Sequence, residues 1–310
     1  MNEKLQEWIN WTSYEELVDC KNNAPRHFLG CHKFNDGQVI IAYRPDAVSI
    51  QIKSKNGKLV DEMEAIGDRG VFGIYFPKEK YHKYKFKVTY PDGTVLETED
   101  PYYFDQQITS MDCYLFGEGN HYDIYEKLGA HPMTVDGVDG VLFAVWAPHA
   151  RRVSVVGDFN LWDARMHQMQ ILEKSGIYEL FIPGVKPGAM YKFQILTREG
   201  EILHKADPYA NSAQLRPETA SVVADLRNFK WTDASWMKKR RAKDRLACRK
   251  EAISIYEVHL GSWKKKDDES EDGFYNYREI APELADYVLE MGYTHIELIG
   301  IAEHPFDGSW

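Results

Sequence analysis

The chain has 310 residues, with 38 Lys and Arg against 48 Asp and Glu, a formal net charge of −10 and an aromatic content of 13%. At roughly 100–200 residues per domain this length predicts two or three domains. The acidic balance argues against a nucleic-acid partner, because polyanions would be repelled. No stretch approaches the ~18 consecutive apolar residues of a membrane span, and the first residues lack the pattern of a secretory signal. We therefore expect a cytoplasmic protein without a membrane partner.

The four cysteines favour neither a metal site nor a disulfide framework. Cys20, Cys31, Cys113 and Cys248 stand far apart, without a C-x-x-C pair or a nearby histidine cluster. Such spacing is typical of reduced thiols in the cytoplasm. We expect no metal and no cofactor.

The first 23 residues predict a helical cap. Within the stretch from Leu5 to Cys20, the apolar residues Leu5, Trp8, Ile9 and Leu17 recur at helical spacing.

The region after the cap contains the same landmarks twice, in the same order. In the first copy they are Leu29–His32, Asp36–Gly37, Pro45–Ala47, Val48–Ser49, Tyr84–Phe86 and Asp100–Tyr102; in the second they are Leu128–His131, Asp139–Gly140, Pro148–Ala150, Val153–Ser154, Tyr191–Phe193 and Asp207–Tyr209. The second copy carries extra residues around Val155–Asp163. A duplication is the simplest explanation.

Both copies read as β-sandwiches. Short runs rich in Val, Ile, Tyr and Phe recur about every ten residues between Gly, Pro, Asn and Asp, without helix patterns between them. The predicted strands are Gln38–Tyr43, Val71–Phe76, Tyr84–Thr89, Val141–Ala147, Ile177–Ile182 and Tyr191–Thr197. We expect two tandem immunoglobulin-like sandwiches, over residues 24–115 and 116–230.

A basic linker over residues 231–252 follows the second sandwich. From Trp236 to Lys250 there are eight Lys and Arg and one acid, Asp244. A phosphate-binding patch is one interpretation, but such a charge run is more often a solvated helix, and we favour the helix.

The last segment, residues 253–310, changes to a strand–helix–strand pattern. Ile253–Leu260 and Thr294–Ile301 are apolar runs of strand length. Between them, Ile280, Leu284, Val288 and Met291 form one helical face; we expect this helix to begin near Arg278 and to end at Gly292. The pattern predicts a parallel β-α-β unit whose strands are buried on both faces.

Specific motifs in this segment and in the second sandwich resemble those of bacterial 1,4-α-glucan (glycogen) branching enzymes. Those of the last segment are Tyr256–Trp263 (YEVHLGSW), Tyr277–Glu279 (YRE) and Glu303–Trp310 (EHPFDGSW). Those of the second sandwich are Gly129–Pro132 (GAHP), Phe143–Pro148 (FAVWAP), Gly157–Asp163 (GDFNLWD) and Lys205–Ala210 (KADPYA). The first sandwich resembles the additional N-terminal module of many such enzymes.

The resemblance implies a mostly β fold in which residues 253–310 start an α-amylase-type (β/α)8 catalytic barrel. It implies a transferase that cuts α-1,4-glucan and moves the cut chain to a 6-hydroxyl. The family's catalytic carboxylates follow later barrel strands, so we expect them beyond Trp310 and the chain, truncated at the start of the barrel, to be inactive by itself. Gly300 departs from the family, which more often has Pro at that step.

For substrate binding, the resemblance points to Trp162 and Lys192 in the second sandwich, and we place His304, Asp307 and Trp310 on the donor-side wall of the barrel. A second stacking tryptophan is absent, since the hairpin Glu199–Leu203 offers Ile or Leu. Glycogen or another α-1,4-glucan is the expected partner, and a monomer the expected state.

Three alternatives stay open. Glu257 and Glu297 could face each other on the two strands, but their mid-strand positions favour a structural role, with His259 and His295 as partners. The chain could also be a non-catalytic glucan-binding or regulatory protein, or a fragment of a related debranching enzyme.

Overall fold

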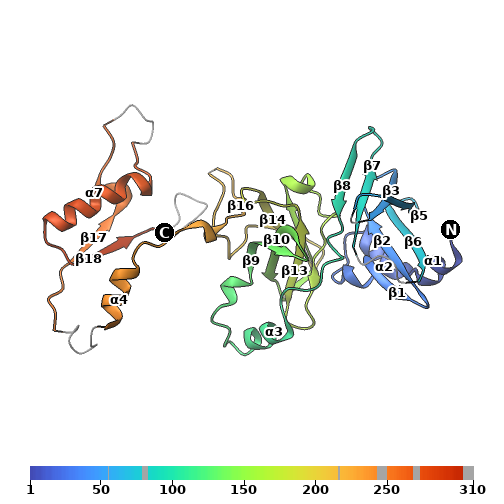
Figure 1. The fold of residues 1–310 in the computed structure, drawn as a ribbon, viewed down its shortest axis with the longest axis horizontal. Coiled ribbons are helices and arrows are strands. Elements are labelled where there is room, and N and C mark those ends of the chain that lie inside the picture. Colours follow the sequence, from blue (N-terminus) through green and yellow to red (C-terminus); the bar gives the residue numbers. More distant parts are fainter. Residues whose placement is uncertain (55, 79–82, 216, 243–249, 268–272, 303–310) are drawn as a thin grey trace. The chain divides into compact units, whose positions relative to one another are not determined.

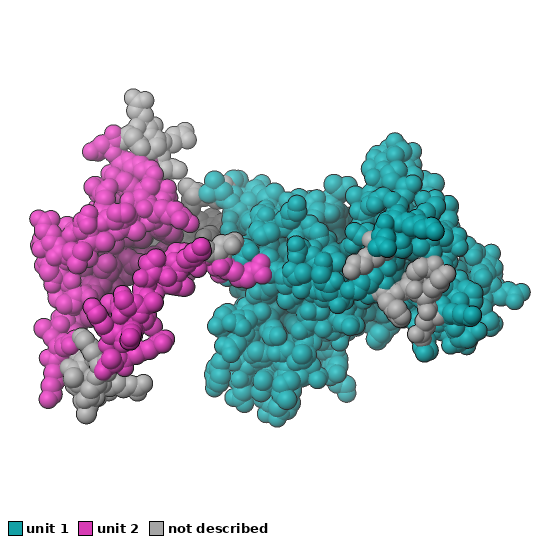
Figure 2. Space-filling view, viewed as in Figure 1, with its two compact units in different colours: residues 1–225 teal, residues 226–310 magenta. Residues whose placement is uncertain are grey.

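A computed structural model describes residues 1–54, 56–78, 83–215, 217–242, 250–267 and 273–302. The chain forms two compact units, Met1–Asp225 and Leu226–Trp310 (Figure 2). In the part of the chain that the structure describes, no helix is long and apolar enough to cross a membrane. Nor do three or more His, Cys, Asp or Glu side chains cluster there as metal ligands would.

The first unit begins with two short helices, α1 (Glu3–Trp8) and α2 (Trp11–Val18), where the sequence suggested a single helical stretch. Asparagine caps start both of them. The side chain of Asn2 accepts from Lys4 N and Leu5 N, and that of Asn10 accepts from Ser13 N. Because a residue at an N-cap has extended backbone, the cap at Asn10 separates the two helices.

The first sandwich consists of two antiparallel sheets (Figure 1). One has the order β1 (Gly30–Phe34), β2 (Gly37–Tyr43), β6 (Val71–Pro77), β5 (Glu64–Ile66). The other has the order β4 (Leu59–Glu62), β3 (Ser49–Ser54), β7 (Tyr84–Thr89), β8 (Val95–Glu99). Numbered along the chain, this arrangement is the ABED and C′CFG order of an immunoglobulin-like sandwich.

The second sandwich repeats the ABED order in one sheet and the CFG order in the other, without a described counterpart of β4. Its sheets have the orders β12 (Gln170–Ile171), β13 (Ile177–Pro183), β10 (Val138–Trp146), β9 (Gly129–Val135) and β11 (Ala150–Gly157), β14 (Met190–Thr197), β15 (Ile202–Lys205), with β16 (Ser221–Val222) also paired to β14. A short helix, α3 (Ser110–Gly117), lies between the sandwiches in sequence. All six strands expected from the sequence are present, and the immunoglobulin-like fold class is confirmed.

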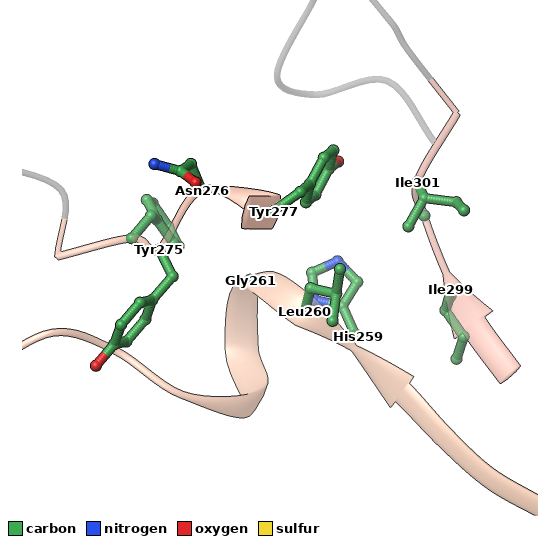
Figure 3. Close-up of a pocket in the computed structure, with 10 residues that line it drawn as sticks. His259, Leu260, Gly261, Tyr275, Asn276, Tyr277, Ile299 and Ile301 are labelled. Carbon is green, nitrogen blue, oxygen red and sulfur yellow. The ribbon is translucent and has the colours of Figure 1, made fainter. Parts of the chain in front are cut away.

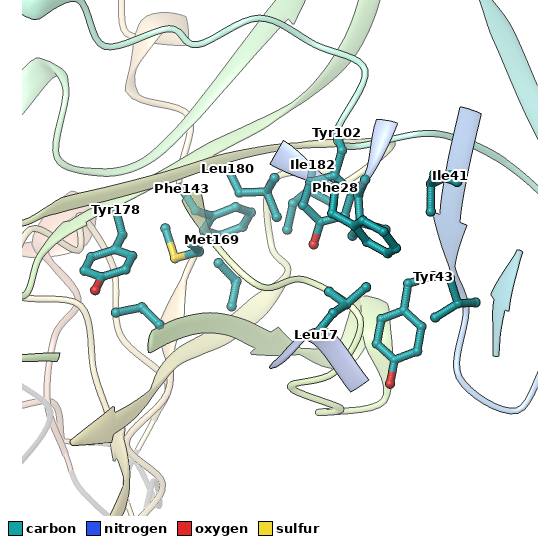
Figure 4. Packing of buried hydrophobic residues seen from close by; sticks show 14 of the residues in the cluster. Leu17, Phe28, Ile41, Tyr43, Tyr102, Phe143, Met169, Tyr178, Leu180 and Ile182 are labelled. Atoms are coloured by element: carbon teal, nitrogen blue, oxygen red, sulfur yellow. The ribbon is translucent and has the colours of Figure 1, made fainter. Parts of the chain in front are cut away.

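The two sandwiches share a hydrophobic core. On β2, Ile40 and Ala42 point into the first sandwich, whereas Val39, Ile41 and Tyr43 join a cluster that also holds Leu17 and the inner residues of the second sandwich. Figure 4 shows Tyr43, Leu17 and Phe28 near Tyr102, and Phe143, Met169 and Tyr178 further along the same cluster. Strand β2 is therefore buried along its whole length, and the first unit behaves as one packed body.

The second unit contains α4 (Ala234–Ala242), β17 (Ile255–His259), α6 (Leu260–Trp263), α7 (Tyr277–Glu290) and β18 (His295–Ile299). The pair β17–β18 is parallel, as expected. Helix α7 begins at Tyr277 with Asn276 as its cap, and Gly292 takes a φ of 78° just after the C-cap Met291, the conformation for which glycine is preferred there.

One expectation about this pair of strands is wrong, because they are not buried on both faces. Helix α7 packs against one face of the strand pair with its buried residues Ile280, Leu284 and Val288, and Val258 on β17 is buried under the helix. All five residues of β18, however, are exposed. A single helix can cover only one face of a two-stranded sheet, so the second face stays open in the described part of the unit. The exposed apolar side chains on β18 are Ile296, Leu298 and Ile299.

Candidate functional site

Trp162 stands in a turn that a buried asparagine holds. The turn follows β11 and contains the short 3₁₀ segment Asp158–Asn160. The Oδ1 atom of Asn160 accepts from Gly157 N at 2.9 Å, and its Nδ2 donates to Val155 O at 2.9 Å and to His167 Nδ1 at 2.9 Å. Since every polar atom of this amide is used, the path of the turn is fixed by hydrogen bonds that the solvent does not weaken.

The two residues after Asn160 adopt an unusual backbone conformation. Leu161 and Trp162 have φ values of 54° and 61°, in the left-handed region that costs a residue with a Cβ roughly 1–2 kcal/mol. Their side chains are nevertheless 89% and 40% exposed. A tryptophan in the core would not need this arrangement, so the turn presents the Trp162 ring at the surface.

Lys192 lies on the strand next to this turn. Strand β14 pairs with β11 so that Lys192 is opposite Val156 and Tyr191 is opposite Gly157. Trp162 N donates to Gly157 O at 2.9 Å. This bond connects the turn to the Gly157–Tyr191 pair, which is next to the Val156–Lys192 pair in the sheet. The Lys192 Nζ donates to Thr219 Oγ1 at 2.8 Å. The backbone thus brings Trp162 and Lys192 to the same end of the second sandwich.

The expected second ring is replaced by an aliphatic side chain. Ile202 on β15 is exposed and pairs with Leu196, four residues along β14 from Lys192. In the first sandwich, the strand that corresponds to β11 is β3, and it continues into β4 in place of a tryptophan turn.

A concave surface lies in the second unit, at the carboxyl ends of the parallel strands. It is a pocket of about 390 Å³, shown in Figure 3. The lining residues are His259, Leu260, Gly261, Phe274, Tyr275, Asn276, Tyr277, Ile299, Gly300 and Ile301. In β/α folds this edge of the sheet carries the functional site. The sequence did not single out Phe274 and Tyr275, although they directly precede the cap of α7.

The mid-strand glutamates do not form a catalytic pair. Glu257 and Glu297 are opposite each other in the parallel register, and both are exposed. The expected histidine partners are wrong: His259 Nδ1 is bonded to Ser262 Oγ at 3.1 Å and His295 Nδ1 to Thr294 Oγ1 at 2.8 Å. Both histidines stand at strand ends, next to hydroxyl side chains that satisfy them locally.

Three of the expected substrate contacts, His304, Asp307 and Trp310, lie outside the described residues. The described part of the barrel-like motif ends just before them, so the structure gives no geometry for the donor-side wall. Cys248 also falls outside, while Cys20 and Cys113 are free thiols.

Two family models match parts of the chain. Residues 127–210 match carbohydrate-binding module 48 (isoamylase N-terminal domain). Residues 10–102 match the N-terminal domain of the alpha-1,4-glucan branching enzyme GlgB. The two matches fall on the second and the first sandwich, respectively.

Curated relatives align with almost the whole chain. The 1,4-alpha-glucan branching enzyme GlgB of Thermosynechococcus vestitus is 44% identical over 96% of this chain and 41% of its own length. That of Synechococcus sp. strain JA-2-3B'a(2-13) is 51% identical over 88% of this chain and 38% of its own length. The chain therefore spans about two fifths of the length of these relatives.

Among solved structures, a pullulanase type I from Bacillus subtilis overlaps 88% of this chain and 38% of its own, with a TM-score of 0.40 and 18% identity. That likeness is too weak to define a fold. The relatives decide the matter: the chain resembles the N-terminal part of bacterial 1,4-alpha-glucan branching enzymes, as its motifs predicted.

Proposed function

We propose that this chain is part of a cytoplasmic, monomeric 1,4-α-glucan branching enzyme, which cuts α-1,4-glucan chains and transfers them to a 6-hydroxyl to form α-1,6 branches in glycogen. The similarity to curated branching enzymes supports this assignment. We propose residues 1–23 as the cap, 24–115 as the N-terminal module, 116–230 as the glycogen-binding-type module, 231–252 as the linker and 253–310 as the start of the catalytic barrel.

The chemistry of branching explains how the work is divided. A retaining transfer needs two carboxyl groups about 5–5.5 Å apart, one as nucleophile and one as acid and base. In barrels such groups come from the carboxyl ends of the strands. Glu257 and Glu297 are mid-strand and exposed, which suits neither role. The 310 residues therefore supply glucan binding and the first part of the catalytic scaffold, and are inactive by themselves.

In the second sandwich, Trp162 and Lys192 contact the glucan. A sugar ring offers an apolar C–H face to an aromatic ring and hydroxyl oxygens to an ammonium donor. The exposed Trp162 ring, presented by a turn that Asn160 fixes, is the observation that carries this proposal. Lys192 already bonds to a hydroxyl group, that of Thr219, so its Nζ is placed to exchange that partner for a sugar hydroxyl. His304, Asp307 and Trp310 stay proposed for the donor-side wall of the barrel.

Affinity electrophoresis in gels that contain glycogen tests the contact on the full 310-residue chain. We expect the unmodified chain to be retarded. Trp162→Ala should reduce the apparent affinity for glycogen roughly tenfold or more, since burying an apolar side chain stabilises a complex by about 1.5–3 kcal/mol. Lys192→Ala weakens retardation less. Trp11→Ala is the matched control, because Trp11 is also exposed but lies on α2. Equal mobility of the unmodified chain and Trp162→Ala would refute the contact.

An iodine-based branching assay tests the other part of the proposal. The 310-residue chain is expected to leave the absorbance of the amylose–iodine complex unchanged, and a product of the length of the curated relatives is expected to lower it. A change produced by the 310-residue chain alone would contradict the proposed division of labour.

A further inference from the structure

A cavity of about 220 Å³ lies between the two sandwiches of the first unit, and Trp162 is not among its lining residues. The first sandwich contributes Arg44, Leu96, Glu97, Thr98 and Pro101 to its lining; the second contributes Phe159, Met166, His167, Ile182, Pro183, Gly184 and Val185. Most of the wall is apolar. The polar lining residues are Arg44, Glu97, Thr98 and His167, of which Arg44 and His167 carry nitrogen donors.

Arg44 is a buried cation that forms no contact ion pair in the described part of the chain, although its charge offsets part of the rise that burial causes in the pKa of the Asp100 carboxyl. Its side chain is only 2% exposed, its Nη1 donates to Tyr43 O at 3.0 Å, and its Nε has no hydrogen-bond partner. The guanidinium lies over the Phe86 ring, 5.8 Å from the centroid. No carboxylate forms an ion pair with it among the residues whose placement is described. Burying a charge in this way is costly unless something compensates it.

His167 supplies a second donor. Because Gly157 N–H must donate to Asn160 Oδ1, the other end of that amide is the NH₂ group, and His167 Nδ1 must accept from it. Burial, and after it the charge of Arg44, lower the pKa of His167 to about 3. The ring is therefore neutral at physiological pH and carries its proton on Nε2, for which no protein partner is found in the described part of the chain.

The acids near the cavity are already engaged elsewhere. Asp100 accepts from the Tyr84 hydroxyl and from Tyr102 N. Asp163 is bonded to Arg165, and Glu97 is paired with Lys53 at the surface. Burial raises the pKa of Asp100 and the charge of Arg44 offsets part of that rise, but none of the three acids forms an ion pair with the guanidinium in the described part of the chain. Two N–H donors, one of them charged, thus line a cavity whose nearby acids have other partners.

We propose that this cavity binds a small oxyanion, namely phosphate or the phosphate group of a sugar monophosphate. Arg44 pairs with the phosphate oxygens through charge-assisted hydrogen bonds, and the Nε2–H group of His167 donates a further bond. Phe159, Met166 and Ile182 cover the uncharged part of the ligand. The cavity is smaller than the roughly 300–1,000 Å³ of pockets for drug-sized ligands, which limits the occupant to a single small molecule.

Isothermal titration calorimetry on the full 310-residue chain tests the site, with inorganic phosphate, glucose 6-phosphate and glucose as probes at constant ionic strength. We expect both phosphates to bind and glucose not to bind. Tighter binding of glucose 6-phosphate identifies a sugar phosphate as the ligand, and equal binding identifies the free anion. Failure of both phosphates to bind, or binding of glucose as tight as that of glucose 6-phosphate, would overturn the proposal.

Variants assign the binding to the cavity. Arg44→Gln should weaken phosphate binding about tenfold or more, because a hydrogen bond to a charged group is lost along with the charge. Arg152→Gln is the matched control and keeps binding, since Arg152 is equally buried but is bonded to Cys20, Ser154 and Gln194. Unchanged binding in Arg44→Gln sinks the idea.

If Arg44→Gln does not fold, as judged by circular dichroism, Met166→Trp decides the question. The larger ring fills the cavity from its apolar wall and leaves Arg44 in place. Loss of phosphate binding in a folded Met166→Trp chain supports the site, and retention of full affinity refutes it.

Discussion

The Tyr191 hydroxyl donates a 2.6 Å hydrogen bond to Oδ2 of Asp207, inside the second sandwich. The first sandwich contains the same bond, from Tyr84 to Asp100 at 2.7 Å. In both copies the other carboxylate oxygen accepts from the backbone two residues on, at Tyr209 and Tyr102. Each Tyr–Asp bond connects the start of one strand to the segment that leaves the sheet. The duplication visible in the sequence is therefore also a duplication of this hydrogen-bond pair.

Removing the Tyr191 hydroxyl, the donor of the bond to Asp207, should destabilise the first unit. Tyr191→Phe leaves a buried carboxylate oxygen without its partner, which costs about 1–3 kcal/mol. Burial raises the pKa of Asp207, and the Tyr191 hydrogen bond counteracts this by lowering it. Without the bond the folded-state pKa rises further, so the stability that the variant loses is present above that pKa, where the carboxyl is ionised, and disappears as pH falls through it. The deficit should therefore be largest near pH 7 and should shrink in acid.

Urea denaturation at pH 7 and pH 4 measures the deficit. Tyr122→Phe is the control, because the side chain of Tyr122 is 84% exposed, and it should change stability by less than about 0.5 kcal/mol. A Tyr191→Phe chain as stable as this control would show that the hydrogen bond contributes nothing.

Glu179 joins the two sandwiches from inside. It is buried on β13 and accepts from Gln107 N at 3.1 Å and from Ile108 N at 2.9 Å, in the segment that leads out of the first sandwich. Glu179→Ala should cost about 2–4 kcal/mol, because two backbone donors lose their acceptor.

The matched control for Glu179 is a surface contact between the same two sandwiches. Asp46 pairs with Arg165 at 2.9 Å, but its side chain is exposed, so Asp46→Ala should cost less than about 1 kcal/mol. Thermal or urea unfolding of both variants gives the comparison. Equal losses would mean that burial does not decide the strength of the junction.

The buried His167 should make the first unit sensitive to acid. Its pKa in the folded chain is lowered to about 3 from an ordinary value of 6.5, chiefly by burial. A base with a lowered pKa contributes stability that is present above pH 6.5 and is lost as pH falls toward 3. At about 1.4 kcal/mol per pKa unit, the loss amounts to several kcal/mol.

His167→Gln should flatten that dependence. The glutamine can still accept from Asn160 but does not titrate, so the free energy of unfolding should change less between pH 6.5 and pH 4 than in the unmodified chain. Urea unfolding at half-unit steps of pH measures both slopes. Identical slopes would assign the acid sensitivity to other groups.

Much of the fold of the first unit could be predicted because its signals are local. Runs such as Tyr84–Thr89 match their strand to the residue, and the repeated Tyr and Asp landmarks turned out to be bonded to each other. The exposure of Trp162 followed from its polar turn. These features depend on alternation, turn residues and spacing, all of which a single sequence displays.

The predictions that were wrong or missing have a common physical cause. They concern features that depend on what packs against a segment, which the segment's own sequence does not show. The apolar run His295–Ile299 predicts burial on both faces, but burial needs covering elements: among the described residues α7 packs on Val258 of the neighbouring strand, and all five residues of His295–Ile299 are exposed. The partners of His259 and His295 depended on side-chain geometry at strand ends. The cavity around Arg44 is formed by residues of both sandwiches that are far apart in sequence, so no sequence motif predicts it.

The left-handed turn before Trp162 stores strain that a substitution can release. Leu161 has a φ of 54° and points into solvent, so its side chain offers little packing against the cost of its backbone conformation. Glycine adopts this region without that cost. Leu161→Gly should therefore keep or raise the stability of the first unit, by up to about 1 kcal/mol, although glycine also gains freedom in the unfolded chain. Leu161→Val should lower stability instead, because a β-branched residue tolerates this region poorly.

Urea unfolding measures the stability of the two variants. Glycogen retardation should persist in Leu161→Gly, because the Asn160 bonds that hold the turn do not involve residue 161. A Leu161→Gly chain less stable than Leu161→Val would contradict the strain.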